Sequence, residues 1–325
     1  DHWSLSSGGP GGECPPTMLD NVYFDMNSGF ADSGMYVNVN VKYACTNDFI
    51  WEPVDNLPTF AMIDTDTVLP FPYYYDSCNL KVWGDFKTNE DMQYMFFGKV
   101  YFESEDDDEY ESVIIDWTYE REPGDYVNLN YFLNQVHFWG REGKWRLDSK
   151  YENYYDTTFL NMGELLLEDD TMSMLNFNAM DTLHKGMYLL GKTIVTLHQY
   201  NADAWTINAY PGINPENPNT KFDAGLSTII AGGDITPPPF NPPGFCNIRT
   251  YGGSLTYHNI QFGDTNTVFP MGPIAIGGLR SMLKSEAQCK YNLVDYYVMG
   301  GDAVGNGIID TLTWKRVTLQ DGTVH

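Results

Sequence analysis

The sequence has few positively charged residues. It contains 18 Lys and Arg residues against 44 Asp and Glu residues, which gives a formal net charge of −26. So few cations cannot neutralise a phosphate backbone or an anionic membrane surface, and we therefore expect no nucleic-acid partner. The excess of carboxylates is typical of a protein that stays soluble, in particular in a salty or cation-rich medium.

Long hydrophobic runs are also missing. Gly, Asp and Asn interrupt the apolar stretches, so none approaches the length of about 20 residues that a membrane-spanning helix needs. We therefore expect no membrane insertion. A chain of 325 residues with 42% hydrophobic content can still bury a substantial core, and this excludes intrinsic disorder.

Cysteine is sparse and scattered. No Cys-x-x-Cys pair suggests a zinc knuckle or a redox motif. The wide spacing predicts one or two long-range disulfides in an oxidising compartment. The chain begins Asp1-His2-Trp3, as a mature protein does after removal of a targeting segment, so we expect a secreted or lumenal location. The five cysteines are Cys14, Cys45, Cys78, Cys246 and Cys289.

Several motifs of known chemistry do not occur. There is no Gly-x-Ser-x-Gly elbow, phosphate-binding loop or dinucleotide fingerprint. No internal repeat and no shift in composition divides the chain, so we expect a single domain over residues 1–325. Asp302 to Thr313 has the outline of a calcium loop but lacks oxygen ligands at two required positions, which favours a turn without a metal.

The densest block of charge runs from Glu103 to Glu111 and holds seven carboxylates. Hard cations prefer several carboxylate oxygens, so this block could gather calcium. A solvated loop between two strands explains the same residues, and we expect an exposed loop.

Short aromatic and β-branched segments, bounded by Gly, Pro, Asn and Asp, predict a mainly β fold with short helices. The alternation in Tyr36 to Tyr43 is typical of one half-buried strand, with Val37, Val39 and Val41 on the same side. The predicted strands are residues 35–43, 95–102, 112–119, 130–139, 192–200 and 204–210. The predicted helices are residues 161–174, 222–231 and 278–286.

Two histidines lie in strand-like segments. His137 belongs to Gln135-Val-His-Phe-Trp-Gly140, and His198 belongs to Thr196-Leu-His-Gln-Tyr-Asn201. Isolated histidines in strands are more often core or edge residues than ligands. A Gly-rich segment, Tyr251 to Thr256, ends in a hydroxyl group.

Several of these segments together resemble an α-class carbonic anhydrase. That family has an Asn-Pro before a short helix, a Phe-x-Pro segment, a Tyr-x-Gly-Ser-Leu-Thr strand and a Val-x-x-x-Pro-Ile-x-Ile segment, in this order. It also has a Gln-x-His-x-His-Trp-Gly strand upstream. The matching segments here are Asn217-Pro218, Phe240-Asn241-Pro242, Tyr251 to Thr256, Val268 to Ile276 and Gln135 to Gly140.

The resemblance implies a central, largely antiparallel sheet with peripheral helices and a large insertion at about residues 45–125. It implies zinc ligands at His137 and His198, a hydroxyl at Thr256 that orients the zinc-bound hydroxide, and Gln135 as the group that holds an imidazole. One histidine of the family's pair is absent. His184, His258 or an acidic side chain could replace it, and no spacing selects one.

The disulfide that ties the resembled family's N-terminal region to its Leu-Thr strand cannot be transferred, because the second cysteine is absent here. We predict instead that Cys246 and Cys289 each join a bridge, since they flank the Gly-rich segment and a long closed loop gives a large entropic stabilisation.

Two classes of function follow. The first is a carbonic anhydrase-like protein with a degraded zinc site and a structural or binding role, with an active zinc-dependent enzyme of CO₂ hydration as its alternative. The second is an extracellular protein that binds carbohydrate or forms a matrix, because 23 Tyr and 8 Trp residues could stack on sugar rings. An aromatic core explains those residues equally well.

Overall fold

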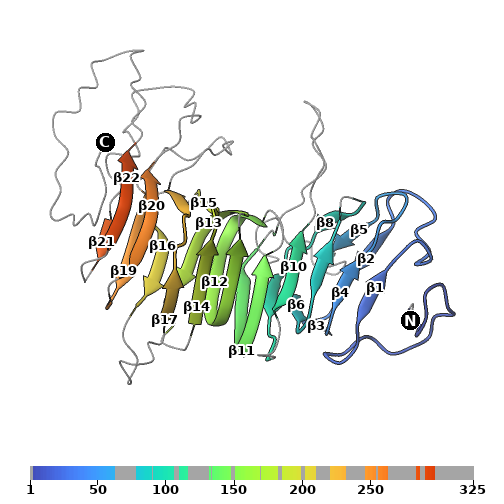
Figure 1. Cartoon of the computed structure of the whole chain (residues 1–325). Helices are drawn as coiled ribbons and strands as arrows, with labels where there is room; N and C mark the ends of the chain where they lie inside the picture. The colour runs from blue at the N-terminus through green and yellow to red at the C-terminus, as the bar shows by residue number, and fades with distance from the viewer. Residues whose placement is uncertain are drawn as a thin grey trace, which may run out of the picture. The chain divides into compact units, whose positions relative to one another are not determined.

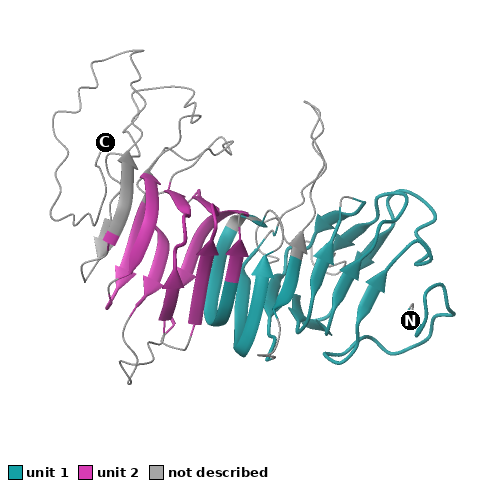
Figure 2. Ribbon diagram, in the orientation of Figure 1, with its two compact units in different colours: residues 1–165 teal, residues 166–325 magenta. Residues whose placement is uncertain are grey.

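The structure is a computed structural model. It describes residues 3–62, 78–89, 91–105, 110–115, 132, 134–147, 151–168, 170–181, 185–198, 202–209, 220–231, 246–253, 255–262, 283–285 and 290–296. The chain divides into two compact units, residues 1–165 and 166–325 (Figure 2). The prediction of a mainly β fold is confirmed. Within the described ranges there is no helix, and thus none long and apolar enough to cross a membrane.

Unit 1 is a coil of short strands that form three parallel ladders (Figure 1). The chain visits the ladders in turn, so every third strand belongs to the same ladder. We call them ladders A, B and C. Ladder A contains β1 (Val22–Phe24), β4 (Phe49–Trp51), β7 (Phe86–Thr88), β10 (Glu111–Ile115) and the end of β11 (Val136–Leu147). Ladder B contains β3 (Tyr43–Thr46), β6 (Asn79–Val82), β9 (Lys99–Phe102) and the start of β11. Ladder C contains β2 (Tyr36–Asn38), β5 (Thr59–Ala61) and β8 (Gln93–Met95).

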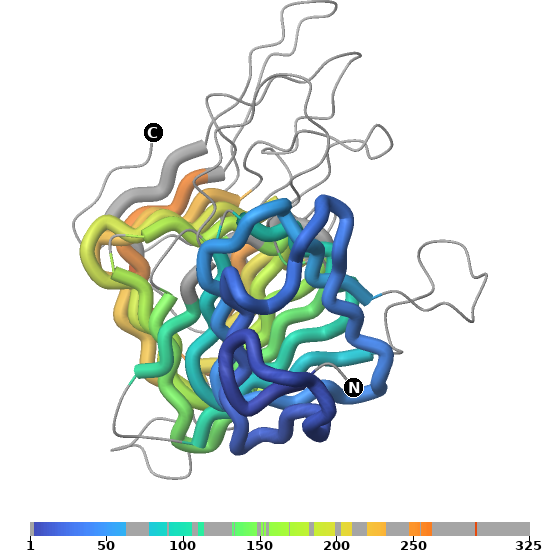
Figure 3. Tube along the Cα trace, turned by 90° about the vertical axis from the view of Figure 1, so that its right-hand side faces the viewer, coloured from blue at the N-terminus to red at the C-terminus, as the bar shows by residue number. Residues whose placement is uncertain are grey.

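The coils of unit 1 stack in register although they differ in length. Val22, Phe49, Phe86, Val113 and Leu147 occupy one level of ladder A, so successive coils are 27, 37, 27 and 34 residues long. Figure 3 shows these coils one behind another, from blue through cyan to green. The variable loop lengths explain why the sequence shows no repeat of fixed period.

The core of unit 1 consists of the side chains that alternate toward the inside of each strand. Leu80, Val100 and Val136 share one inward level of ladder B, and Val82, Phe102 and Phe138 share the next. The rings of Phe102 and Phe138 stack with centroids 5.0 Å apart, as do Phe49 and Phe86 at 5.1 Å. Aromatic residues thus fill the interior, which agrees with an aromatic core as an explanation of their abundance.

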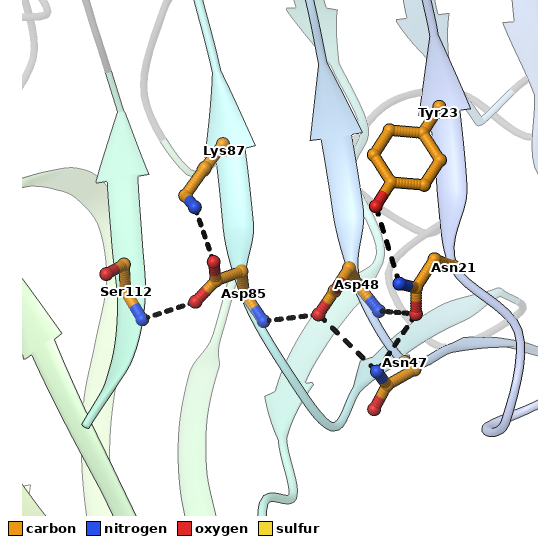
Figure 4. A network of polar contacts seen from close by, with 7 residues as sticks. All are labelled: Asn21, Tyr23, Asn47, Asp48, Asp85, Lys87 and Ser112. Atoms are coloured by element: carbon orange, nitrogen blue, oxygen red, sulfur yellow. Dashed lines mark hydrogen bonds and ion pairs between the residues drawn. The ribbon is translucent and has the colours of Figure 1, made fainter. Parts of the chain in front are cut away.

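Polar side chains hold the coils of ladder A together just before each strand begins (Figure 4). The Asp85 N–H donates to Asp48 Oδ1 (3.0 Å), and the Ser112 N–H donates to Asp85 Oδ1 (2.8 Å). The Asp48 N–H reaches Asn21 Oδ1 at 3.4 Å, and Lys87 forms an ion pair with Asp85. Each side chain therefore satisfies a backbone donor of the next coil.

Unit 2 repeats this pattern with its own strands. One ladder contains the start of β13 (Thr171–Ala179), β15 (Ile194–Leu197), β18 (Thr228–Ala231), β20 (Thr256–Phe262) and β22 (Lys290–Tyr296). A second contains the end of β13, β16 (Ala202–Asn208), β19 (Cys246–Tyr251) and β21 (Leu283–Ser285). A third pairs β14 (Lys185–Leu190) with β17 (Thr220–Asp223). β12 (Tyr151–Glu168) contributes residues to both units.

The expected largely antiparallel sheet is not confirmed, because the strand pairs given above for each ladder are parallel. Strands of successive coils run in the same direction, and this makes their pairing parallel. The strand expected over Tyr36 to Tyr43 is divided between β2 and β3, because the chain turns a corner between two ladders there.

The helix predictions are wrong wherever the structure describes the residues concerned. Of residues 161–174, 161–168 lie in β12 and 171–174 in β13, while residue 169 lies outside the described part. Residues 222–231 form the end of β17, a turn and β18, because Gly225 takes a positive φ of 47° and the β-branched Thr228, Ile229 and Ile230 favour a strand. Of residues 278–286, β21 covers 283–285, and the others lie outside the described part.

Candidate functional site

The outward side chains of ladder B in unit 1 form a continuous strip of rings and polar groups. We call this strip the aromatic face. Alternation places these residues outside while their neighbours fill the core. Its members are Tyr43, Cys45, Lys81, Trp83, Lys99, Tyr101, Glu103, Gln135, His137 and Trp139, joined by Phe159 and Asn161 of β12.

His137 lies in the middle of a three-ring stack on the aromatic face. Its imidazole is 4.7 Å from the Tyr101 ring and 4.5 Å from the Phe159 ring, with interplanar angles of 14° and 5°. His137 Nε2 is 3.3 Å from Gln135 Oε1, and Nδ1 is 3.2 Å from Asn161 Oδ1. Binding a metal through either nitrogen would require one of these contacts to break.

Burial lowers the pKa of His137 below its usual value. The hydrogen bond with Asn161 opposes this change, Lys99 lowers the pKa further, and Asp156 raises it. The neutral imidazole is thus the form that this environment favours.

Lys81 lies beside His137's stack and is enclosed by three rings. Its Nζ is 5.5 Å from the Tyr43 centroid, 5.8 Å from Trp83 and 5.7 Å from Tyr101. The same ammonium pairs with Glu103 Oε1 at 2.7 Å. The cation and the carboxylate neutralise each other, so this part of the strip carries hydrogen-bonding groups with little net charge.

Two rings of the strip remain open to solvent. Tyr43 is 49% exposed and Trp139 is 44% exposed, whereas the inner rings cover one another. Tyr43 lies on the first strand of ladder B and Trp139 on the fourth. Three strand spacings, about 14 Å, separate them across the ladder. Trp139 also lies four residues beyond Gln135, which is level with Tyr43, and this adds about 13 Å along the strands, so the two positions are about 19 Å apart on a diagonal.

The structure brings Gln135 and His137 together but does not bring His198 and Thr256 together. Leu197 pairs with Ala231, which pairs with Phe262, so His198 lies just beyond the level of Phe262. Thr256 is six positions before Phe262, which places it about 20 Å away along the strands. His198 Nε2 instead contacts Ser173 Oγ at 3.1 Å.

The other predicted ligand groups are only partly described. His258 lies in β20, and His184 lies outside the described part. Across the described ranges, no group of three or more His, Cys, Asp or Glu side chains is placed to hold a metal ion. In the acidic block, Glu103 pairs with Lys81, while residues 106–109 lie outside the described part.

The disulfide prediction falls on cysteines whose side chains the structure does not describe, Cys246 and Cys289. Cys14 is an exposed free thiol and Cys45 a half-buried one. Residues 302–313 also lie outside the described part.

Sequence reasoning missed most of the aromatic face. Lys81, Trp83, Tyr101, Glu103, Phe159 and Asn161 were not among the expected site residues. The alternation in residues 79–83 and 99–103 does separate an apolar side from a polar and aromatic side. It does not reveal that these two strands are neighbours.

Comparison with known proteins gives no match: no family model, no curated protein and no solved structure is similar to this chain.

Proposed function

We propose that the aromatic face of unit 1 binds an extended, uncharged glycan without cleaving it. The observation that carries this proposal is the position of two open rings, Tyr43 and Trp139, at diagonally opposite ends of a strip of hydrogen-bonding side chains. Sugar rings offer apolar C–H faces to aromatic rings and hydroxyls to polar groups, so a strip that alternates the two suits them.

The distance between the open rings supports a polymer as the ligand. A diagonal span of about 19 Å is longer than a single sugar and suits a chain of several residues. Gln135, Asn161 and the Lys81–Glu103 pair lie on this strip and could accept and donate hydrogen bonds to hydroxyl groups.

The charge of the chain supports an uncharged ligand. At a net charge of −26, a polyanion would be repelled at long range. Lys81 is already paired with Glu103, so it offers no strong site for a carboxylate or sulfate group.

Isothermal titration calorimetry against a set of soluble neutral polysaccharides tests the proposal. Trp139→Ala and Tyr43→Ala should each weaken binding about tenfold, or about 1.4 kcal/mol. Tyr23→Ala and Tyr36→Ala are matched controls, because these tyrosines are 56% and 55% exposed but lie on ladders A and C. A series of oligosaccharides should show a steep gain in affinity once the ligand spans both rings.

Two outcomes would contradict the proposal. Binding that falls equally in the control variants would place the glycan elsewhere or show a nonspecific effect. No binding of any neutral polysaccharide by the intact chain would remove the proposed function.

The carbonic anhydrase-like assignment, the zinc site at His137 and His198, and the secreted or lumenal location stay predictions. Two histidines supply fewer ligands than the three that catalytic zinc requires, so we expect little or no CO₂ hydration when zinc is added. Stopped-flow assays check this, and robust activity that disappears in His137→Ala and His198→Ala would contradict it.

A further inference from the structure

Unit 2 holds a serine and a histidine at the same level of neighbouring strands. Ser227 directly precedes β18, and His258 lies in β20. Thr228 pairs with Asn259, and the Asn259 N–H donates to the Ser227 carbonyl at 3.0 Å. Ser227 and His258 therefore lie opposite each other, one strand spacing of about 4.8 Å apart.

Ser227 is buried and lies on the same side of its strand as the buried Ile229. His258 is half-buried and lies between Tyr257 and Ile260, which are both buried. Ser227 Oγ and His258 Nδ1 are themselves buried, and neither forms a hydrogen bond with any described residue.

The neighbouring coil shows how a buried hydroxyl at such a position can form a hydrogen bond within the protein. Thr228 also pairs with Ile194, so Thr193 lies opposite Ser227 on the other side. The Thr193 hydroxyl is buried as well, but it donates to the Leu190 carbonyl at 2.7 Å. Nearly all buried polar atoms in folded proteins have a partner, and internal water supplies it where the protein does not.

We propose that one ordered water molecule binds between Ser227 Oγ and His258 Nδ1. The water donates a hydrogen bond to Nδ1 and forms a second hydrogen bond with the serine hydroxyl. Nδ1 is then an acceptor, so the ring N–H of His258 lies at Nε2.

A second serine–histidine pair in unit 2 provides a matched control. Ser173 Oγ contacts His198 Nε2 directly at 3.1 Å and leaves no room for a bridging water. Ser173→Ala thus removes a direct contact, whereas Ser227→Ala removes one anchor of the proposed water.

Nitrogen NMR of the full chain with ¹⁵N-labelled histidine tests the proposal at neutral pH, with His258→Gln used to assign the signal. We expect a His258 spectrum typical of the Nε2–H tautomer with a hydrogen-bonded Nδ1. Ser227→Ala should shift the Nδ1 signal, Ser227→Thr should retain it, and Ser173→Ala should leave it unchanged.

A high-resolution crystal structure of the full chain completes the test. Density for a water within hydrogen-bonding distance of both atoms would support the site. A proton on Nδ1, an Nδ1 signal indifferent to Ser227→Ala, or a direct Ser227–His258 bond with no water would each overturn the proposal.

Discussion

His137 acquires its properties from residues of other coils. Tyr101 lies one coil before it, and Phe159 and Asn161 belong to the following strand. The Gln-Val-His motif explains only the contact of His137 with Gln135, which lies two residues away. The rest of its environment depends on the register of ladder B.

We predict that His137→Phe makes the protein less sensitive to acid. The pKa of His137 is lowered in the folded chain, so the unfolded chain binds more protons as the pH falls below about 6.5, and acid destabilises the native state. Denaturant unfolding at pH 7.5 and pH 5 measures how much the free energy of unfolding falls between the two pH values, and this decrease should be smaller in the variant. His137→Ala should cost about 1 kcal/mol at pH 7.5 because the ring stack is lost. Equal acid sensitivity of wild type and His137→Phe would contradict this prediction.

Lys185 offers a second titration test. Burial lowers its pKa to about 8, although Asp181 raises it, and its ammonium donates to the Asp181 carbonyl. Below pH 8 the cost of burying the charge is fully present, and it is relieved as the pH rises from about 8 toward 10.5.

We therefore predict that the stability of Lys185→Met relative to wild type decreases between pH 7 and pH 10, by up to about 3 kcal/mol. Urea unfolding at both pH values measures the difference. The exposed Lys192→Met is the control for the loss of one lysine from the chain. A constant or growing advantage of Lys185→Met would show that the buried amine does not titrate in this range.

At the scale of elements, the polar ladder of Asn21, Asp48, Asp85 and Ser112 fixes the starting points of four strands. We predict that Asp85→Ala lowers the free energy of unfolding by about 2 kcal/mol, because the Ser112 N–H and Lys87 both lose a partner. Asp85→Asn should cost less, since its amide oxygen can still accept from Ser112. Equilibrium unfolding measures both, with the exposed Asp32→Ala as a control that should change stability by less than about 0.5 kcal/mol.

The aromatic interior is the other source of stability in these strands. Phe86 is buried and packs against Phe49, Phe102 and Phe132. Phe86→Ala should cost about 3–5 kcal/mol through lost burial and the cavity left behind. The outward Lys87→Ala on the same strand should cost far less. Thermal unfolding separates the two, and a small effect of Phe86→Ala would show that the core collapses to fill the space.

At the scale of the whole molecule, the charge of −26 should repel itself in the compact state. Salt screens this repulsion within about 10 Å at 0.1 M. We predict that the midpoint of thermal unfolding rises when sodium chloride increases from about 10 to 300 mM. Calorimetry measures the midpoint, and a fall with salt would show that attractive ion pairs such as Lys81–Glu103 outweigh the repulsion.

The mainly β fold and many strand positions could be predicted, because alternation and β-branched residues are local signals. Residues 99–102 and 136–139 show this clearly. The coils could not be recognised, because loops of unequal length hide the period. The helix predicted over residues 222–231 failed for a similar reason, since its hydrophobic positions suited two strands joined by a turn at Gly225.

The sequence by itself determined the acidity, the β content and which side chains of each strand face the same way. Each of these depends on composition or on neighbours within a few residues. Only the tertiary structure decided that strands pair in parallel, that Tyr101, His137 and Phe159 stack, and that Ser227 faces His258. The physical reason is that register between coils follows from packing of residues 20 to 44 positions apart, which no local pattern specifies.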